Sequence, residues 1–493
     1  MGEVNKIFLR TAKVFALKIF VAIFAFLIQV QLGRMLGMGD YGSFSLFLSV
    51  ASVISVFPLM GMDSGIIREV ASASSKGRRK WCILISLICV VSILLLTGII
   101  MPFVSPYIAS TIGLSDNLLT LLLFYLVVLV LNTLAGAVLQ GEQRNVLNDG
   151  TTALTSMSKV LTIYILGKYD VGLYEVLIAY ISLEFIYTVG RWGIIFKEYK
   201  NIGTVWAPIN EVRKYLCYCL PLFFVSSIGI IQCSLHRFVT AYYLDAYSVG
   251  VLKVCENFSG ALSLFVAPFV TTWPVMAAYY KERRLDDIKS MFHKCSVAIT
   301  AMIMPALTAL IICAPELLQL FNLSVTENNM LIVILFVFCL GTVYDAIIGP
   351  AGALLKMTEY SRISFYNAAI LLVLTIVFSC VLIPHFGLLG AAGALSLSHF
   401  VINTLNAWQN YRLFGLMPYG KSQIGLIIWS VPVFGIAMYV RNIIKIGDVY
   451  NVLIYSLVIY LLFGGFVFAF YKNIREKLLM NMRRIKSAVF RFR

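Results

Sequence analysis

The feature that most constrains this chain is a succession of long apolar runs. Stretches of about 20 mainly apolar residues follow one another from residue 11 to residue 471. A helix of that length crosses the hydrocarbon core of a bilayer. The alternation of apolar and polar residues in blocks of about ten, which is typical of outer-membrane barrels, is not seen. The sequence therefore predicts an all-α membrane protein.

The composition excludes an ordinary soluble domain. Hydrophobic residues make up 60% of the chain and charged residues 13%, with a mean hydropathy of +0.90. Soluble domains carry about 25% charged residues, so this chain could not cover a surface that faces water. The ten cysteines lie mostly inside apolar runs and form no CxxC pair. They are interpreted as small core residues rather than as a disulfide frame or a metal site.

We predict fourteen transmembrane spans. Basic residues before the first run resemble the start of a signal peptide, but no small-residue cleavage site follows, so this span is expected to be retained. The predicted spans are 11–32, 42–62, 81–103, 118–140, 149–166, 173–196, 215–235, 248–273, 295–314, 329–355, 364–383, 388–410, 423–440 and 449–471.

The distribution of basic residues predicts the topology. If the N-terminus is cytoplasmic, the inside segments hold 29 of the 39 basic residues and the outside loops hold 5. Lysine and arginine accumulate on the cytoplasmic side of membrane proteins, so both termini are expected in the cytoplasm. The net charge of +16 follows mostly from this topology. A nucleic-acid partner is not needed to explain it.

A weak internal repeat connects the two halves of the chain. The segment GDYGSFSLFL (39–48) is similar to YSVGVLKVCE (247–256), six spans later. Copies an even number of spans apart have the same orientation in the membrane. Gly39–Gly42 is predicted to form the tight external turn between the first two spans. Pro58, with Gly61, is predicted to bend the second span and to act as a hinge.

Three stretches of the chain resemble a known family. They are GRMLGMGDYGSFSLFLSVASVISVFPLMGMDSGIIREVA (33–71), LPLFFVSSIGIIQCSLHRFVTAYYLDAYSVGVLKVC (220–255) and FGLLGAAGALSLSHFVINTLNAWQNYRLFGL (386–416). In order and spacing the chain resembles the Wzx-type oligosaccharide flippases of the multidrug/oligosaccharidyl-lipid/polysaccharide (MOP) exporter superfamily. That family usually has Asp-Arg at the end of span seven. Here His236 precedes Arg237, so an ion-pair role of that aspartate does not carry over.

The resemblance implies a fold, a cargo and partners. Two six-helix lobes, 1–200 and 201–420, would form a V around a central cavity, and 421–493 would add two spans and a basic tail. The cargo would be an undecaprenyl-diphosphate-linked oligosaccharide, moved across the bacterial cytoplasmic (inner) membrane for assembly of O-antigen, capsule or exopolysaccharide. Membrane lipids, a polysaccharide polymerase and a chain-length regulator are the expected partners. No cofactor, metal or nucleic acid is expected.

Polar residues inside the predicted spans mark the candidate site. Charge at membrane depth is costly and usually faces protein or a water-filled cavity. Lysine binds phosphate as a point charge, so basic groups suit a diphosphate, and amides suit sugar hydroxyls. The predicted cavity residues are Lys18, Gln29, Arg34, Lys159, Arg191, Lys253 and Asn257. The candidate carboxylates for ion coupling are Glu184, Glu256 and Asp345.

Structural roles remain open for part of this set. Glu184 and Arg191 lie on one helical face and are equally well explained as a neutralised pair. By contrast, Lys18 and Lys159 have no acidic residue three or four positions away. Lys253 has only Glu256 at such a distance. A lysine with little or no local neutralisation at membrane depth favours a cavity role, which is the interpretation we adopt for all three.

The pattern favours a transporter over an enzyme. The four histidines are scattered, and neither a Ser-His-Asp set nor a phosphate loop is found. A polymerase, ligase or glycosyltransferase would need a long external loop, and the outside loops are short. A flippase for the lipid-linked peptidoglycan precursor remains an alternative, as does a MATE-like drug/cation antiporter. The antiporter is disfavoured because basic residues outnumber acidic residues within the spans.

Overall fold

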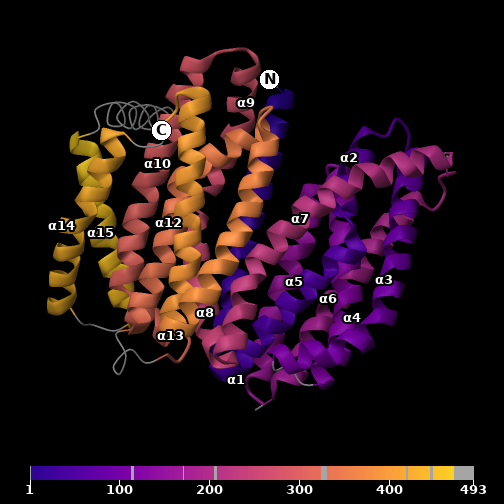
Figure 1. Ribbon diagram of the computed structural model, residues 1–493, viewed down its shortest axis with the longest axis horizontal. Helices are drawn as coiled ribbons and strands as arrows, with labels where there is room; N and C mark the ends of the chain where they lie inside the picture. Colours follow the sequence, from indigo (N-terminus) through magenta and orange to yellow (C-terminus); the bar gives the residue numbers. More distant parts are fainter. Residues whose placement is uncertain are drawn as a thin grey trace, which may run out of the picture. The chain divides into compact units, whose positions relative to one another are not determined.

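The computed structural model describes residues 2–112, 116–169, 171–204, 208–323, 330–417, 420–444 and 448–470. In these ranges the chain consists of helices and short connections (Figure 1). The helices are α1 Gly2–Leu59, α2 Met62–Ser72, α3 Lys76–Ile112, α4 Asp116–Gly141, α5 Asn145–Leu166, α6 Leu173–Tyr199, α7 Ile209–Tyr243, α8 Ala246–Ser263, the 3-10 helix η1 Ala267–Thr272, α9 Trp273–Lys281, α10 Leu285–Ile312, α11 Ala314–Gln319, α12 Met330–Met357, α13 Ser361–Phe414, α14 Lys421–Ile443 and α15 Asp448–Phe470.

Ten helices of the described chain are long and apolar enough to cross a membrane. Two of them, α1 and α13, each hold two predicted spans. Non-helical backbone interrupts α1 at Gly37 (φ 73°, ψ 169°) and α13 at Gly387 (φ 56°, ψ −133°). The two predicted spans that remain lie in α5 and in α8 followed by η1. The prediction of an all-α, multi-pass membrane protein is confirmed, and the helices accommodate all fourteen predicted spans.

The break between the first two spans is at Gly37, so the predicted turn at Gly39–Gly42 is wrong. Those four residues are helical and begin the second span. Gly37 has a positive φ that favours glycine. Gly42 serves close packing instead, because a Cβ there would lie 1.7 Å from the carbonyl oxygen of Ala246.

The two copies of the weak repeat contact each other at equivalent positions. Gly250, near the start of α8, holds the place in the second copy that Gly42 holds in the first. A Cβ on Gly250 would lie 2.1 Å from the carbonyl oxygen of Met38 in α1. The two helices therefore cross backbone against backbone, and a side chain at either glycine would push them apart.

The chain divides into two compact units, Met1–Val254 with Leu372–Ala391 and Cys255–Leu371 with Ala392–Arg493. In the first unit, α1 packs against α5, α4 and α7, while α4 packs against α6 and α2. Its apolar core lies between α2, α3, α4 and α6, and includes the buried side chains of Ile66, Trp81 and Leu134. This core packs α4 and α6, which carry part of the polar network described below, against α2 and α3.

In the second unit, α10 is the central helix. It packs against α9, α12, α14 and α15, and α14 also contacts α15. Arg441 of α14 donates a hydrogen bond to the carbonyl oxygen of Ile312 (2.5 Å) and lies 3.2 Å from Glu316 Oε1. The last two spans thus belong to this unit. The lobe boundaries at residues 200 and 420 stay predictions.

The segment predicted as a hinge is a break between two helices. Helix α1 ends at Leu59, directly after Pro58, and α2 begins at Met62. Between them, Gly61 has a φ of 73°. A Cβ on Gly61 would lie 2.4 Å from the carbonyl oxygen of Cys219 in α7. The break is therefore packed against α7, and its movement during transport stays a prediction.

Candidate functional site

A polar network surrounds the Arg191 guanidinium on α4, α5 and α6. Its Nη1 donates to Asn132 Oδ1 (2.7 Å), and its Nε donates to Thr151 Oγ1 (2.8 Å). Its Nη2 donates to Thr152 Oγ1 (2.6 Å) and to the carbonyl oxygen of Asn148 (3.2 Å). Arg191 is 6% exposed. Within the described residues, its hydrogen-bond partners are all neutral, so they solvate the charge without cancelling it.

Lys159 and Glu184 form a buried ion pair beside Arg191. Lys159 Nζ bonds to Glu184 Oε1 and lies 3.4 Å from the centroid of the Tyr180 ring. Asn132 Nδ2 donates to Glu184 Oε2 (3.0 Å), so this amide bridges Glu184 and Arg191. Lys159 is 4% exposed. The ion-pair partner of Glu184 is therefore Lys159 rather than Arg191.

Lys18 is connected to this network through Asp149. Lys18 is exposed on α1, and its charge acts on the Asp149 carboxyl group of α5, as does the charge of Arg191. Asp149 Oδ2 is buried and accepts no hydrogen bond from the part of the chain that the structure describes. Three cations and two carboxylates thus gather on α1, α5 and α6.

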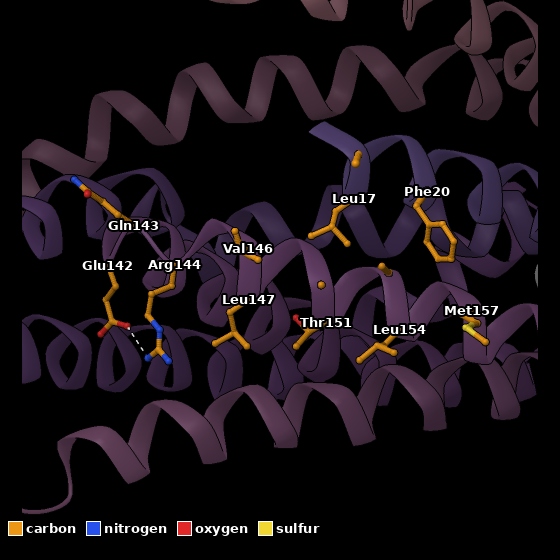
Figure 2. A pocket seen from close by; sticks show the side chains of 13 residues that line it. Leu17, Phe20, Glu142, Gln143, Arg144, Val146, Leu147, Thr151, Leu154 and Met157 are labelled. Atoms are coloured by element: carbon orange, nitrogen blue, oxygen red, sulfur yellow. Dashed lines mark ion pairs between the residues drawn. The ribbon is translucent and has the colours of Figure 1, made fainter. Parts of the chain in front are cut away.

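A groove of about 1260 Å³ lies between α1 and α5 beside this network. Its walls are largely apolar and include Ala16, Leu17, Phe20, Val146, Leu147, Leu154 and Met157. Figure 2 shows Glu142 and Arg144 at one end of the groove, joined by an ion pair of 3.6 Å. Thr151 lines the groove and accepts the hydrogen bond from Arg191. The polar network therefore borders a mainly apolar groove.

The other predicted cavity residues lie elsewhere on α1 and on α8. Gln29 Oε1 accepts a hydrogen bond from the Tyr41 hydroxyl group (2.7 Å), which ties the two segments of α1 together. Arg34 is exposed near the end of the first span. Lys253 and Asn257 are half-buried on α8. Contact of these residues with a cargo stays a prediction.

Of the predicted ion-coupling carboxylates, Asp345 belongs to a polar cluster in the second unit. Its Oδ1 accepts a hydrogen bond from Asn403 Nδ2 (2.8 Å) and lies 3.8 Å from His399 Nδ1. The Asp345 side chain is 52% exposed. Glu256 is half-buried on α8, and Glu184 is engaged by Lys159. Ion coupling by these carboxylates stays a prediction.

The sequence interpretation missed Asp149 and the partner of Lys159. Partners were sought three or four positions away in the same helix, whereas Lys159 pairs with a carboxylate on a neighbouring helix and the charge of Lys18 acts on another. Asp149 was visible as an acidic residue at the start of a predicted span. Its closeness to Lys18 depends on the packing of α1 against α5, which the sequence pattern does not specify.

Comparisons with known proteins agree on a family. The family model described as "Polysaccharide biosynthesis protein" matches residues 11–280. The capsular polysaccharide biosynthesis protein CapF of Staphylococcus aureus is 24% identical over 228 residues, 43% of this chain, and the chain spans about half (53%) of that relative. The probable low-salt glycan biosynthesis flippase Agl15 of Haloferax volcanii is 22% identical over 494 residues, which cover 96% of this chain and 98% of that protein.

A solved structure shares the fold over nearly the whole chain. The lipid II flippase MurJ in an inward closed conformation superposes with a TM-score of 0.74, covering 92% of this chain and 98% of that chain. The sequences are 14% identical, so the likeness concerns the fold alone.

Proposed function

The chain belongs to the polysaccharide biosynthesis protein family, and we propose that it moves undecaprenyl-diphosphate-linked oligosaccharides from the inner to the outer leaflet of a bacterial cytoplasmic membrane. The predicted relationship to polysaccharide flippases is confirmed by the family match and by the full-length similarity to a probable glycan flippase. These relatives indicate a transporter rather than an enzyme. The cargo, the membrane and the direction of transport are parts of the proposal.

The observation that carries the proposal is the combination of an apolar groove with buried cations next to it. A lipid-linked diphosphate has a long apolar chain and a negatively charged headgroup. The groove between α1 and α5 offers apolar walls, and Arg191 lies directly behind Thr151 at its border. Lys18, Lys159 and Arg191 outnumber the two carboxylates beside them, so the network has a net positive charge that can attract an anion.

The mechanism we propose is alternating access, in which the binding site opens to one leaflet at a time. Lys18 and Lys253 are the accessible cations, and they contact the cargo diphosphate. Glu256 lies three positions after Lys253 on α8 and holds its charge in the empty carrier. The diphosphate replaces Glu256 on loading. Lys253 therefore keeps an anionic neighbour throughout the cycle. In the orientation that we propose from the charge bias, both termini lie in the cytoplasm.

Substitutions at Lys253 test this proposal. Lys253→Arg should retain much of the activity because the charge is kept, Lys253→Ala should lose most of it, and Lys253→Glu should be inactive. The measurement is the restoration of surface polysaccharide in a bacterial strain that lacks its flippase, with membrane insertion checked by immunoblotting. Lys289→Ala, at an exposed lysine of α10, is the matched control and should restore wild-type levels. Normal transport by Lys253→Ala would remove Lys253 from the mechanism.

The same strain background separates the proposal from its nearest alternative. A peptidoglycan-precursor flippase would support growth when the host's own lipid II flippase is depleted, whereas the proposed function predicts no rescue. Rescue of growth without restoration of surface polysaccharide would contradict the proposed cargo.

A further inference from the structure

A second pocket, separate from the groove between α1 and α5, lies between α3 and α6. Its volume is about 560 Å³. Both helices pack against α4, which belongs to the same unit (Figure 1). The lining of this pocket includes the apolar side chains of Ile83, Leu84, Ile195 and Phe196, and the basic side chains of Lys80, Lys197 and Lys200. Among the residues that the structure describes, no acidic side chain lines this pocket.

The three lysines of this pocket are not neutralised by the surrounding protein. Across the described ranges, no carboxylate lies within ion-pair distance of their ammonium groups. Glu198, which lies between two of them in sequence, is paired with Arg144 instead. Lys80 Nζ donates a hydrogen bond to the carbonyl oxygen of Ile202 (2.7 Å), which fixes its position but leaves its charge uncompensated. The pocket therefore presents a cluster of positive charge.

Basic and apolar residues follow opposite orders along the sequences of α3 and α6, and therefore the same order in space, because the two helices run in opposite directions. In α3, Lys80 lies about one turn before Leu84, and in α6, Phe196 lies about one turn before Lys200. Because α3 begins where α6 ends, both helices place their lysines at the end of the pocket that is predicted to face the cytoplasm. The start of α3 adds the positive end of a helix dipole. The lining thus changes from cationic to apolar towards the membrane interior.

We propose that this pocket binds an anionic phospholipid of the cytoplasmic leaflet. The lipid phosphate lies among the three ammonium groups, and the beginning of the acyl chains lies against Leu84 and Phe196. Basic pockets between transmembrane helices on the cytoplasmic side suit such headgroups. A soluble anion would make no apolar contact with the inner part of the pocket. A lipid without net charge would not neutralise the charge of the three lysines. This inference is independent of the proposed cargo.

Lipid binding to the purified full-length protein tests the inference. Native mass spectrometry with added phosphatidylglycerol or phosphatidylcholine should show tighter binding of phosphatidylglycerol. The Lys197→Gln/Lys200→Gln variant should bind phosphatidylglycerol about 25-fold more weakly, since each lysine near an anionic lipid contributes a factor of about five. Lys289→Gln/Lys294→Gln removes the same number of charges from exposed positions on α10 and should keep the wild-type affinity.

Each of four results would overturn the inference. The first is equal affinity of the wild-type protein for the two lipids, and the second is unchanged phosphatidylglycerol binding in Lys197→Gln/Lys200→Gln. The third is full displacement of the lipid by millimolar inorganic phosphate, which would indicate a site for a free anion. The charge-preserving variant Lys197→Arg/Lys200→Arg should retain binding. Loss of binding in it, with an unchanged size-exclusion profile, would also contradict the charge argument.

Discussion

Replacing Gly42 by alanine tests the backbone crossing between α1 and α8. The new Cβ would lie 1.7 Å from the carbonyl oxygen of Ala246, while Cβ contacts essentially never fall below 3.0 Å. The helices would have to move apart by about 1.3 Å, the difference between these distances. Overpacking costs about 1–3 kcal/mol, and we expect the upper end because a backbone oxygen cannot rotate away.

The assay is thermal denaturation of the purified protein in detergent. Gly39→Ala is the matched control, because a Cβ at Gly39 has no atom within 4 Å and the residue lies in the same helix. It should be neutral or slightly stabilising, since alanine favours helices more than glycine. Gly250→Ala should behave like Gly42→Ala, and the double variant should cost less than the sum, because one separation relieves both clashes. Equal denaturation midpoints for Gly42→Ala and Gly39→Ala would refute the crossing.

Two further predictions concern the ion pair and the helix break. Glu184→Gln should destabilise the protein by about 3–5 kcal/mol because it leaves the buried Lys159 charge unpaired. Adding Lys159→Met should recover much of the loss in denaturation midpoint. No recovery would show that the unpaired charge is not the cause of the destabilisation. Pro58→Ala should give folded, inserted protein that restores surface polysaccharide more slowly. The reason is that alanine straightens the helix end before the Met60–Gly61 break. Full activity would count against a hinge at this position.

The spans were predictable from sequence because lipid selects long apolar helices so strongly. Charge bias adds an orientation for those spans, which stays a prediction. The positions of the breaks were less predictable. Gly37 and Gly42 are both glycines in a polar stretch, but one has a positive φ and the other is needed for helix contact. Only the tertiary packing against α8 distinguishes the two roles.

The candidate site was predicted residue by residue but not as an arrangement. Lys159, Glu184 and Arg191 stand out because charge is rare inside apolar runs. Their pairing could not be deduced, since Lys159 and Glu184 are 25 positions apart on different helices. The same holds for Asp149 and Lys18, whose charges interact because α1 packs against α5. Helical periodicity predicts which residues share a face of one helix. It does not predict which neighbouring helix provides the ion-pair partner of a charged residue.

The surroundings of the four predicted cavity cations differ, and so do the roles that we expect for them. They are Lys18, Lys159, Arg191 and Lys253. Lys159 is 4% exposed and already paired, so a cargo phosphate could reach it only by displacing Glu184 inside a tightly packed helix trio. Removing one partner of such a pair costs about 3–5 kcal/mol, which the cargo would have to supply. Lys18 and Lys253 are more accessible, and so we expect them to contact the diphosphate. Lys159 and Arg191 connect α6 to α5 through Glu184, Thr151 and Thr152, and we expect their role to be the positioning of these helices.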